Sequence, residues 1–276
     1  MIIGRSVADT AALLPRLFSL CRAAQATAAQ LAFGLPLSAD ATSDLTREIL
    51  RDHLIKFHLK WPKLFGRTPR PLPVDWAEGS GALRSDLFGP AGRMPKTPDA
   101  FSSFLAAGQG VAGVLGLIDR CFGAGEAATN GLPLPEPTNM LARDAIENSV
   151  AARHAGHPVM RAIAEQKGYG PVWRAAACAY DLEACLDKAL PQPLTAQKGT
   201  AIVPATRGTY AMTACVSDGV VVEFSRVTPT DHLLAEGGIL QQSLASLPVE
   251  KSALAPLVLE ILDPCTPVRL REVAHA

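Results

Sequence analysis

Six cysteines give this chain its clearest capacity for metal chemistry. They are scattered along the 276 residues as Cys21, Cys121, Cys178, Cys185, Cys215 and Cys265. Thiolates are soft ligands that bind transition metals, but no two of these cysteines form a Cys-x-x-Cys pair, which argues against a zinc ribbon or a thioredoxin-type redox site. Cys178 and Cys185 lie seven residues apart on a predicted helix, too far for one metal without a third ligand.

Cys265 lies in a segment that could be half of a metal site. It directly follows Asp263 and Pro264. Val268 occupies the position where a second thiol would complete a Cys-x-x-Cys, and Arg271 stands three residues further on, where a histidine could sit. The residues alone leave two interpretations open, an ordinary tail with a single cysteine and the remnant of a metal site.

The other generic motifs are absent or ambiguous. His154 and His157 could share a helix face and bind a metal, but histidines near a Gly or Pro are more often hydrogen-bonded at a helix end. The sequence has no P-loop, no His-Glu-x-x-His and no Gly-x-Ser-x-Gly. No enzyme class follows from these patterns.

The elements that must position these residues are predicted to be mainly helical. Apolar content is 48% with only 5% aromatic residues, because alanine and leucine carry much of it, which favours helices. Apolar spacing predicts helices over 8–33, 43–60, 98–122, 140–168, 171–190 and 250–262, with an irregular Pro- and Gly-rich segment over 61–97. After Pro191 the sequence alternates and is rich in Val and Thr, and Ser217–Gly219 is typical of a hairpin turn.

These elements predict an α+β fold with one domain over 1–276. It would be helical over 1–190, form a β hairpin region over 200–230, and end in a helix and tail over 250–276. Cys121, Cys178, Cys185 and Cys215 are expected to be small core residues.

Composition limits the partners and the compartment. The 26 basic and 26 acidic residues predict neither a nucleic-acid surface nor an anionic membrane as partner. The most apolar run, 104–118, is too short to span a membrane and is expected to be a buried helix. The first residues lack the apolar core of a secretory signal, so a cytoplasmic location with free thiols is expected.

Four stretches, occurring in order, resemble the large subunit of nickel–iron hydrogenases. The first is 16–32, where the family has Arg, any residue, Cys, Gly, any residue and Cys before a helix of small residues. Arg16 and Cys21 match this pattern, whereas Phe18 replaces the first cysteine and Ser19 the glycine.

The other three stretches lie in the second half of the chain. The segment 203–230 is similar to the family's Ala-Pro-Arg-Gly, strand, Asp-Gly turn, strand and Pro-Thr or Pro-Ser, with Arg207, Gly208 and the pair Pro229–Thr230 among the matches. The tail resembles Asp-Pro-Cys-x-x-Cys-x-x-His, matched only as far as Cys265. The segment 145–158 is a weaker match that precedes the strands.

The departures from the enzyme pattern imply a different role. The enzymes hold nickel and iron with four thiolates, of which Cys21 and Cys265 match two. The chain therefore resembles the HupK/HoxV family of hydrogenase maturation proteins, and the resemblance implies a reduced large-subunit-like fold that does not turn over hydrogen. Such proteins are proposed to carry an Fe(CN)2(CO) group in transit to the apo large subunit, and no nickel is expected.

The resemblance also implies the site and the partners. Cys21 and Cys265 would hold the iron, and Arg207, Pro229 and Thr230 would contact its cyanide ligands, with apolar walls from the Val-rich hairpin around the carbon monoxide. A HypC-like chaperone, the hydrogenase large subunit precursor and other Hyp maturation proteins are the implied partners. Two alternatives stay open, a metal-free adaptor that docks these partners and an enzyme with a mononuclear iron.

Overall fold

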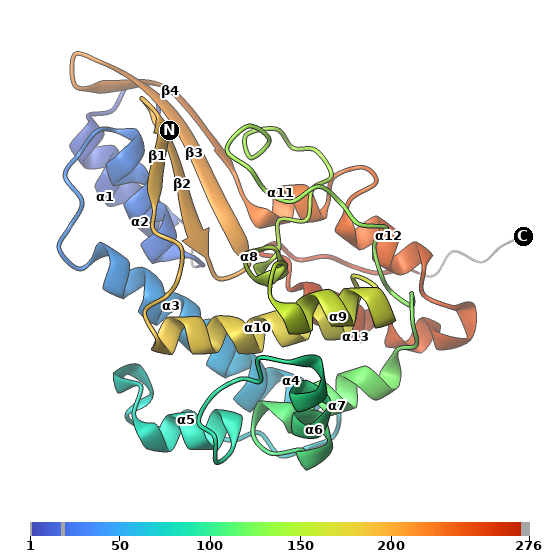
Figure 1. The fold of residues 1–276 in the computed structure, drawn as a ribbon. Coiled ribbons are helices and arrows are strands. Elements are labelled where there is room, and N and C mark those ends of the chain that lie inside the picture. The colour runs from blue at the N-terminus through green and yellow to red at the C-terminus, as the bar shows by residue number, and fades with distance from the viewer. Residues whose placement is uncertain (1, 18–19, 272–276) are drawn as a thin grey trace, which may run out of the picture.

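A four-stranded antiparallel sheet lies beside a larger group of helices in the computed structural model, which describes residues 2–17 and 20–271 (Figure 1). The strands follow one another across the sheet as β1 Leu194–Gln197, β2 Thr200–Ala205, β3 Gly208–Ser217 and β4 Val220–Val227. The predicted mainly helical α+β fold is confirmed. Within the described residues the sheet has two strands more than the predicted hairpin, because β1 and β2 precede it.

Both hairpin turns of β3 follow from local backbone chemistry. Asp218 and Gly219 connect β3 to β4 with φ of 50° and 73°, the left-handed pair that a tight two-residue turn requires, so the predicted turn is confirmed. At the other end of β3, Thr206 and Arg207 form the turn from β2. Gly208 follows this turn with a φ of 149°, and a Cβ there would lie 2.5 Å from the carbonyl oxygen of Asn148.

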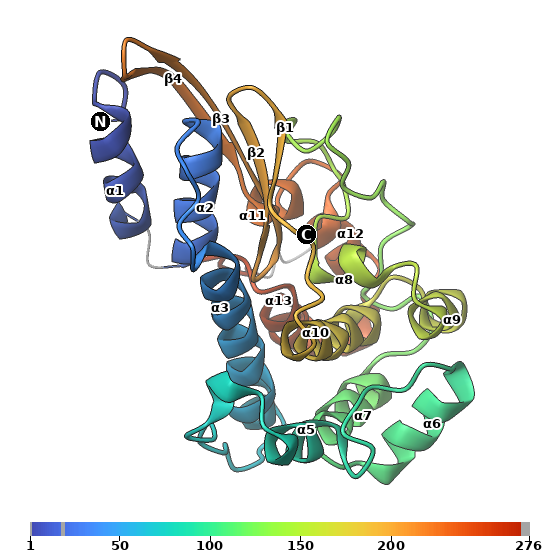
Figure 2. The ribbon, with the colours of Figure 1, turned by 60° about the vertical axis from the view of Figure 1, so that its left-hand side comes forward.

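Two helices cover one face of the sheet (Figure 2). They are α1 Val7–Leu17 and α2 Arg22–Ala32, so the single helix predicted over 8–33 is wrong. The second helix begins after Cys21, whose φ of 54° is left-handed and ends any continuous helical path. Alanines on its inner face pack against small residues of β2, which lets helix and sheet approach closely: Ala24, Ala28, Ala29, Ala32, Ala201 and Val203.

A second core surrounds helix α10 Pro171–Leu186, most of whose residues are buried. The helices that pack against it are α3 Ala41–Ile55, α7 Val111–Cys121, α8 Val150–His154, α9 Pro158–Lys167 and α13 Ala255–Leu262. Helix α3 continues into a π-helical turn, η1 Lys56–Lys60, and then α4 Trp61–Leu64. Such π turns often occur at functional sites.

Several boundaries differ from the sequence-based predictions. Residues 140–149 are not helical, and 61–97 contains η2 Trp76–Glu78 and the helix α5 Gly81–Phe88, which is capped by the Ser80 hydroxyl. Three further short helices were not predicted as separate elements: α11 Pro229–Leu233, α12 Ile239–Ala245 and η3 Val249–Leu254.

The most apolar run forms two helices rather than one. Helix α6 Pro98–Ala107 meets α7 at a 99° bend, and most of α7 is buried in the helical core. In the part of the chain that the structure describes, no single helix is both long and apolar enough to cross a membrane, and only this bent pair reaches that size when taken together.

Gly208→Ala should destabilise the fold more than Gly219→Ala. Both glycines have positive φ, which costs a residue with a Cβ about 1 kcal/mol or more. A Cβ at Gly219 meets open space, whereas one at Gly208 meets the Asn148 backbone. Urea denaturation should therefore give a loss of free energy of unfolding at least about 1 kcal/mol larger for Gly208→Ala. Equal losses would show that the contact with Asn148 does not constrain the turn.

Candidate functional site

Two cysteines from opposite ends of the sequence line one cavity. Cys21 and Cys265 share a cavity of about 340 Å³ with Arg207, Pro229 and Thr230. The volume lies within the range of small-molecule sites, about 300–1,000 Å³. All five residues selected from the sequence therefore surround the same space. Phe18 and Ser19, which replace the family's cysteine and glycine, lie outside the described residues.

Cys21 is placed by the start of α2. It is the residue before the first helical turn and is half-buried with a left-handed backbone. Glu48 from α3 accepts hydrogen bonds from the backbone N–H groups of Ala23 at 2.9 Å and Ala24 at 3.4 Å, so its carboxylate caps the helix. The cap fixes the chain direction at Cys21 and leaves its sulfur facing the turn between β2 and β3.

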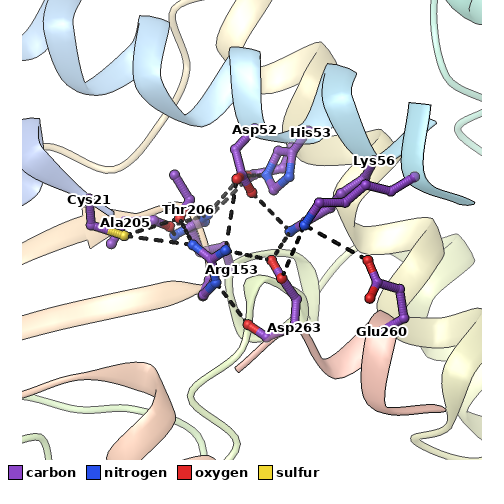
Figure 3. Close-up of polar contacts among 12 residues, drawn as sticks. Cys21, Asp52, His53, Lys56, Arg153, Ala205, Thr206, Glu260 and Asp263 are labelled. Carbon is purple, nitrogen blue, oxygen red and sulfur yellow. Dashed lines mark hydrogen bonds and ion pairs between the residues drawn. The ribbon is translucent and has the colours of Figure 1, made fainter. Parts of the chain in front are cut away.

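That turn brings a hydroxyl and a guanidinium to the sulfur. Thr206 Oγ1 lies 3.1 Å from Cys21 Sγ, and Arg207 Nη1 lies 2.9 Å from the same oxygen and 4.0 Å from the sulfur. Figure 3 shows Cys21 and Thr206 beside the cluster of charged groups that surrounds the turn. The turn thus presents hydrogen-bond donors to one of the two thiols.

Arg207 is also the link to the tail. Its Nε donates to the backbone carbonyl of Asp263 at 2.8 Å, and its Nη2 lies 3.0 Å from Asp263 Oδ2. Asp263 is largely buried, ends α13 with a φ of 47°, and precedes Cys265 by two residues. Arg207 therefore forms a structural ion pair with the tail and also lines the cavity.

A basic pair on η1 holds the same aspartate. Lys56, which is 3% exposed, lies 3.2 Å from Asp263 Oδ2 and 3.1 Å from Asp52 Oδ2, and Lys60 lies 3.7 Å from Asp263 Oδ1 (Figure 3). Burial acts to raise the pKa of Asp52, but the charges of Lys56 and Arg207 outweigh it and lower this pKa to about 2. The buried cations Lys56 and Arg207 are thus matched by the carboxylates of Asp52 and Asp263, as buried charges require.

Cys265 is fixed by its backbone. Its N–H donates to Thr230 Oγ1 at 2.9 Å, while the thiol is exposed on the cavity side. Thr230 is 5% exposed, and a hydroxyl that accepts one bond can still donate its hydrogen to a second acceptor. Thr230 therefore both positions Cys265 and offers a donor to the cavity.

The apolar walls differ from the prediction. The described lining contains no valine of the hairpin, since Val221 packs into the core between sheet and helices. Leu17, Leu20 and Pro229 provide apolar surface instead. The prediction was wrong because Val221 pairs with Val216 beside the Asp218–Gly219 turn, at the opposite end of β3 from Arg207.

Electrostatics at Cys21 are mixed. Burial raises the pKa of its thiol above the ordinary value, while the hydrogen bond with Thr206 and the charge of Arg207 act to lower it. Burial dominates, so the metal-free thiol is protonated at neutral pH, and a metal ion would displace that proton.

A second polar layer supports the β2–β3 turn from behind. Arg153 on α8 donates to the carbonyl oxygens of Ala205 at 3.0 Å and Gly208 at 2.6 Å, which flank the turn. Its other nitrogens donate to Asp181 at 2.7 and 3.0 Å, and Asp181 is fully buried. The sheet's turn and α10 are therefore joined through one arginine.

Two histidines complete this layer. His53 and His154 each place Nε2 at 2.8 Å from an oxygen of Asp181. Burial would raise the pKa of Asp181, but the charge of Arg153 and the hydrogen bonds from both histidines hold it well below its ordinary value. His157 caps α9 through Val159, so the pair His154 and His157 has the hydrogen-bonding roles that were the alternative to metal binding.

The segment before the strands supplies a further brace. The Asn148 side chain forms two hydrogen bonds with the backbone of Thr209 on β3, each at 2.8 Å. Its Nδ2 donates to the Thr209 carbonyl oxygen, and its Oδ1 accepts from the Thr209 N–H. These two hydrogen bonds tie Asn148 to the strand and account for the non-helical backbone at this residue.

The remaining cysteines are dispersed. Cys178 and Cys185 are buried as predicted, and Cys121 is partly buried against the core. Cys215 is exposed, so its prediction as a core residue is wrong; it lies in the part of β3 beyond the covered face. Among residues 2–17 and 20–271, no three His, Cys, Asp or Glu side chains group as a metal site.

Sequence reasoning missed Thr206, Asp52 and Lys56. Thr206 had a usable signal, because it stands where the resembling enzymes have the proline of Ala-Pro-Arg-Gly. Asp52 and Lys56 form an i,i+4 pair on one helix, but their other partners, Arg207 and Asp263, lie about 150 to 210 residues away, so no local pattern connects the pair to the site.

Asp181→Asn should lower stability by about 3–5 kcal/mol, because it leaves Arg153 buried without its charge partner. Chemical denaturation at neutral pH measures the loss. The exposed pair Arg70–Asp86 provides the control, and Asp86→Asn should cost less than about 1 kcal/mol.

The ionisation of Asp181 should also make the stability of the fold depend on pH. Because the folded-state pKa of Asp181 is depressed, its stabilisation is complete above about pH 4 and is lost as the pH falls through the folded value. The Asn variant should lose this acid-side slope. An unchanged slope would contradict the assignment.

Asp263→Asn should loosen the tail. The variant weakens contacts with Lys56, Lys60 and Arg207, and losing one charged hydrogen bond, about 1.5 kcal/mol, corresponds to roughly tenfold faster amide exchange at Cys265. Glu260→Gln is the control, since among the described residues Glu260 pairs with Lys60 alone, at 3.8 Å. Equal exchange in both variants would show that Asp263 does not hold the tail.

No protein-family model matches the chain. The chain is 49% identical over 276 residues to the hydrogenase expression/formation protein HupK of Rhodobacter capsulatus. The alignment covers all of this chain and 90% of HupK.

The fold is similar to solved hydrogenases. A chain of the Ni-Fe-Se hydrogenase from Desulfovibrio vulgaris Hildenborough superposes with a TM-score of 0.56 at 15% identity, covering 96% of this chain and 90% of that one. The reduced, active enzyme from Desulfomicrobium baculatum gives 0.52 at 13%, with the same coverages. These likenesses confirm the predicted hydrogenase large-subunit-like fold, and the sequence match shows that the chain belongs to the HupK family of hydrogenase expression/formation proteins.

Proposed function

We propose that this chain carries an Fe(CN)2(CO) group during hydrogenase formation and passes it to the apo large subunit of a nickel–iron hydrogenase. The observation that carries the proposal is the meeting of Cys21 and Cys265 in one cavity with Arg207 and Thr230. Membership of the HupK family supplies the context of hydrogenase formation.

The donor set suits iron that already has strong ligands. Thiolate sulfur is a soft donor, which suits an iron that carries cyanide and carbon monoxide. Two thiolates do not form a full coordination shell, but the cargo contributes its own cyanides and carbon monoxide. The loss of two further cysteine positions, at Phe18 and Val268, removes the sulfurs that nickel would need, so nickel is not part of the proposal.

The polar groups suit cyanide. A bound cyanide exposes a nitrogen that accepts hydrogen bonds and carries negative charge. The Thr230 hydroxyl hydrogen and the guanidinium of Arg207 are donors at the cavity wall. Leu17, Leu20 and Pro229 give the carbon monoxide an apolar surface.

Transfer requires two docking events, one to receive the group and one to release it. A HypC-like chaperone is the proposed donor and the hydrogenase large subunit precursor the acceptor. Leu17 and Leu20 at the cavity are 38% and 39% exposed, which offers apolar contact to a partner beside the proposed iron position. No catalytic turnover is assigned to the chain.

Infrared spectroscopy tests the proposal. The chain, purified without oxygen from cells that mature a hydrogenase, should show cyanide and carbonyl bands with iron. Cys21→Ser and Cys265→Ser should each reduce bound iron by at least about tenfold and remove the bands.

Cys215→Ser is the matched control, because Cys215 is exposed on β3 and does not line the cavity. Its bands should be unchanged. Bands that survive both site substitutions would refute the assigned ligands. Absence of iron from the unsubstituted chain, together with retained binding to the precursor, would favour the metal-free adaptor.

A further inference from the structure

The hydrogen bond between Thr206 and Cys21 has a direction that its neighbours determine. Arg207 can only donate, so at 2.9 Å its Nη1 occupies the acceptor side of Thr206 Oγ1. The Thr206 hydrogen is then free to point at Cys21 Sγ, 3.1 Å away. When a metal displaces the thiol proton the sulfur can only accept, which makes Thr206 the donor.

The surroundings strengthen this bond. Thr206 is 2% exposed, so water does not compete for its hydroxyl. The positive guanidinium bonded to its oxygen polarises the O–H group, and hydrogen bonds in such a chain reinforce one another at low dielectric. Arg207 is itself held by Asp263, so the hydroxyl is fixed in direction.

We propose that Thr206, acting through Cys21, weakens the iron–sulfur bond on this side of the site so that the cargo is held reversibly. A hydrogen bond to a metal-bound thiolate withdraws electron density from sulfur and reduces its donation to the metal. The inference rests on the proposed function, and it gives Thr206 a positioning role that serves release rather than tight binding.

The proline of the resembling Ala-Pro-Arg-Gly pattern has no group that could make this bond. In this chain Thr206 and Arg207 form the two-residue turn between β2 and β3, and Thr206 places a hydroxyl beside the sulfur. The hydroxyl of Thr206 therefore lies beside the sulfur whose bond to iron a carrier must break on transfer, whereas a permanent metal site keeps that bond.

Infrared frequencies of the loaded chain test the inference. Thr206→Val keeps the shape of the side chain and removes the hydroxyl. With the sulfur a stronger donor, the iron gives more density to its diatomic ligands, so the cyanide and carbonyl bands should move to lower wavenumber. Iron loss during incubation with excess dithiothreitol should slow by about tenfold. Thr206→Ser should restore both values to those of the unsubstituted chain.

The outcomes separate the two claims. Unshifted bands and unchanged iron loss in Thr206→Val, or a Ser variant that behaves like Val, would overturn the role of Thr206 and leave the carrier function standing. Faster loss in Val would overturn it as well. If the Val variant does not fold, Thr206→Ala removes the same hydroxyl with less side-chain volume. A loaded state missing from the unsubstituted chain would overturn both claims.

Discussion

The guanidinium of Arg207 is the group on which the proposed site depends. It bonds to Thr206 beside Cys21 and to Asp263 just before Cys265, and so connects two cysteines that are 244 residues apart in sequence. Its side chain is 8% exposed, and a buried cation is tolerated only when carboxylates and hydrogen bonds compensate it. Asp263 supplies that compensation from the tail, so holding the cation and holding the tail are one requirement.

The surrounding structure keeps this link in place. Arg153 and Asp181 hold the turn from behind, and Lys56 on the π-helical turn holds Asp263 from the side. Cys21 and Asp263 both have left-handed backbones, each of which costs a non-glycine residue about 1 kcal/mol or more. Such costs persist where the surrounding contacts over-determine the conformation, which often occurs at functional sites. The helices and sheet thus bring a polar frame to a cavity with a mixed lining, in which Leu17, Leu20 and Pro229 supply apolar surface.

How far the sequence predicts this molecule depends on the range of the interactions. The turn at Asp218–Gly219 was predictable because two adjacent residues determine it. The break at Cys21 was not, because apolar spacing continues through it. The meeting of Cys21 with Cys265 was expected only from the resemblance to hydrogenase large subunits, and no local pattern contains it. Asp181 was missed because its partners come from two other helices, α3 and α8, and Cys215 was misjudged because a strand pattern does not reveal where the covered face ends.

The coordination of iron in the loaded chain tests the central claim most directly. X-ray absorption at the iron edge counts the sulfur atoms bound to iron. The account predicts two sulfur ligands in the unsubstituted chain and in Cys215→Ser, and a smaller sulfur contribution in whatever iron remains bound to Cys21→Ser or Cys265→Ser. Iron with no sulfur ligand, or a sulfur count that neither substitution lowers, would contradict a site built from Cys21 and Cys265.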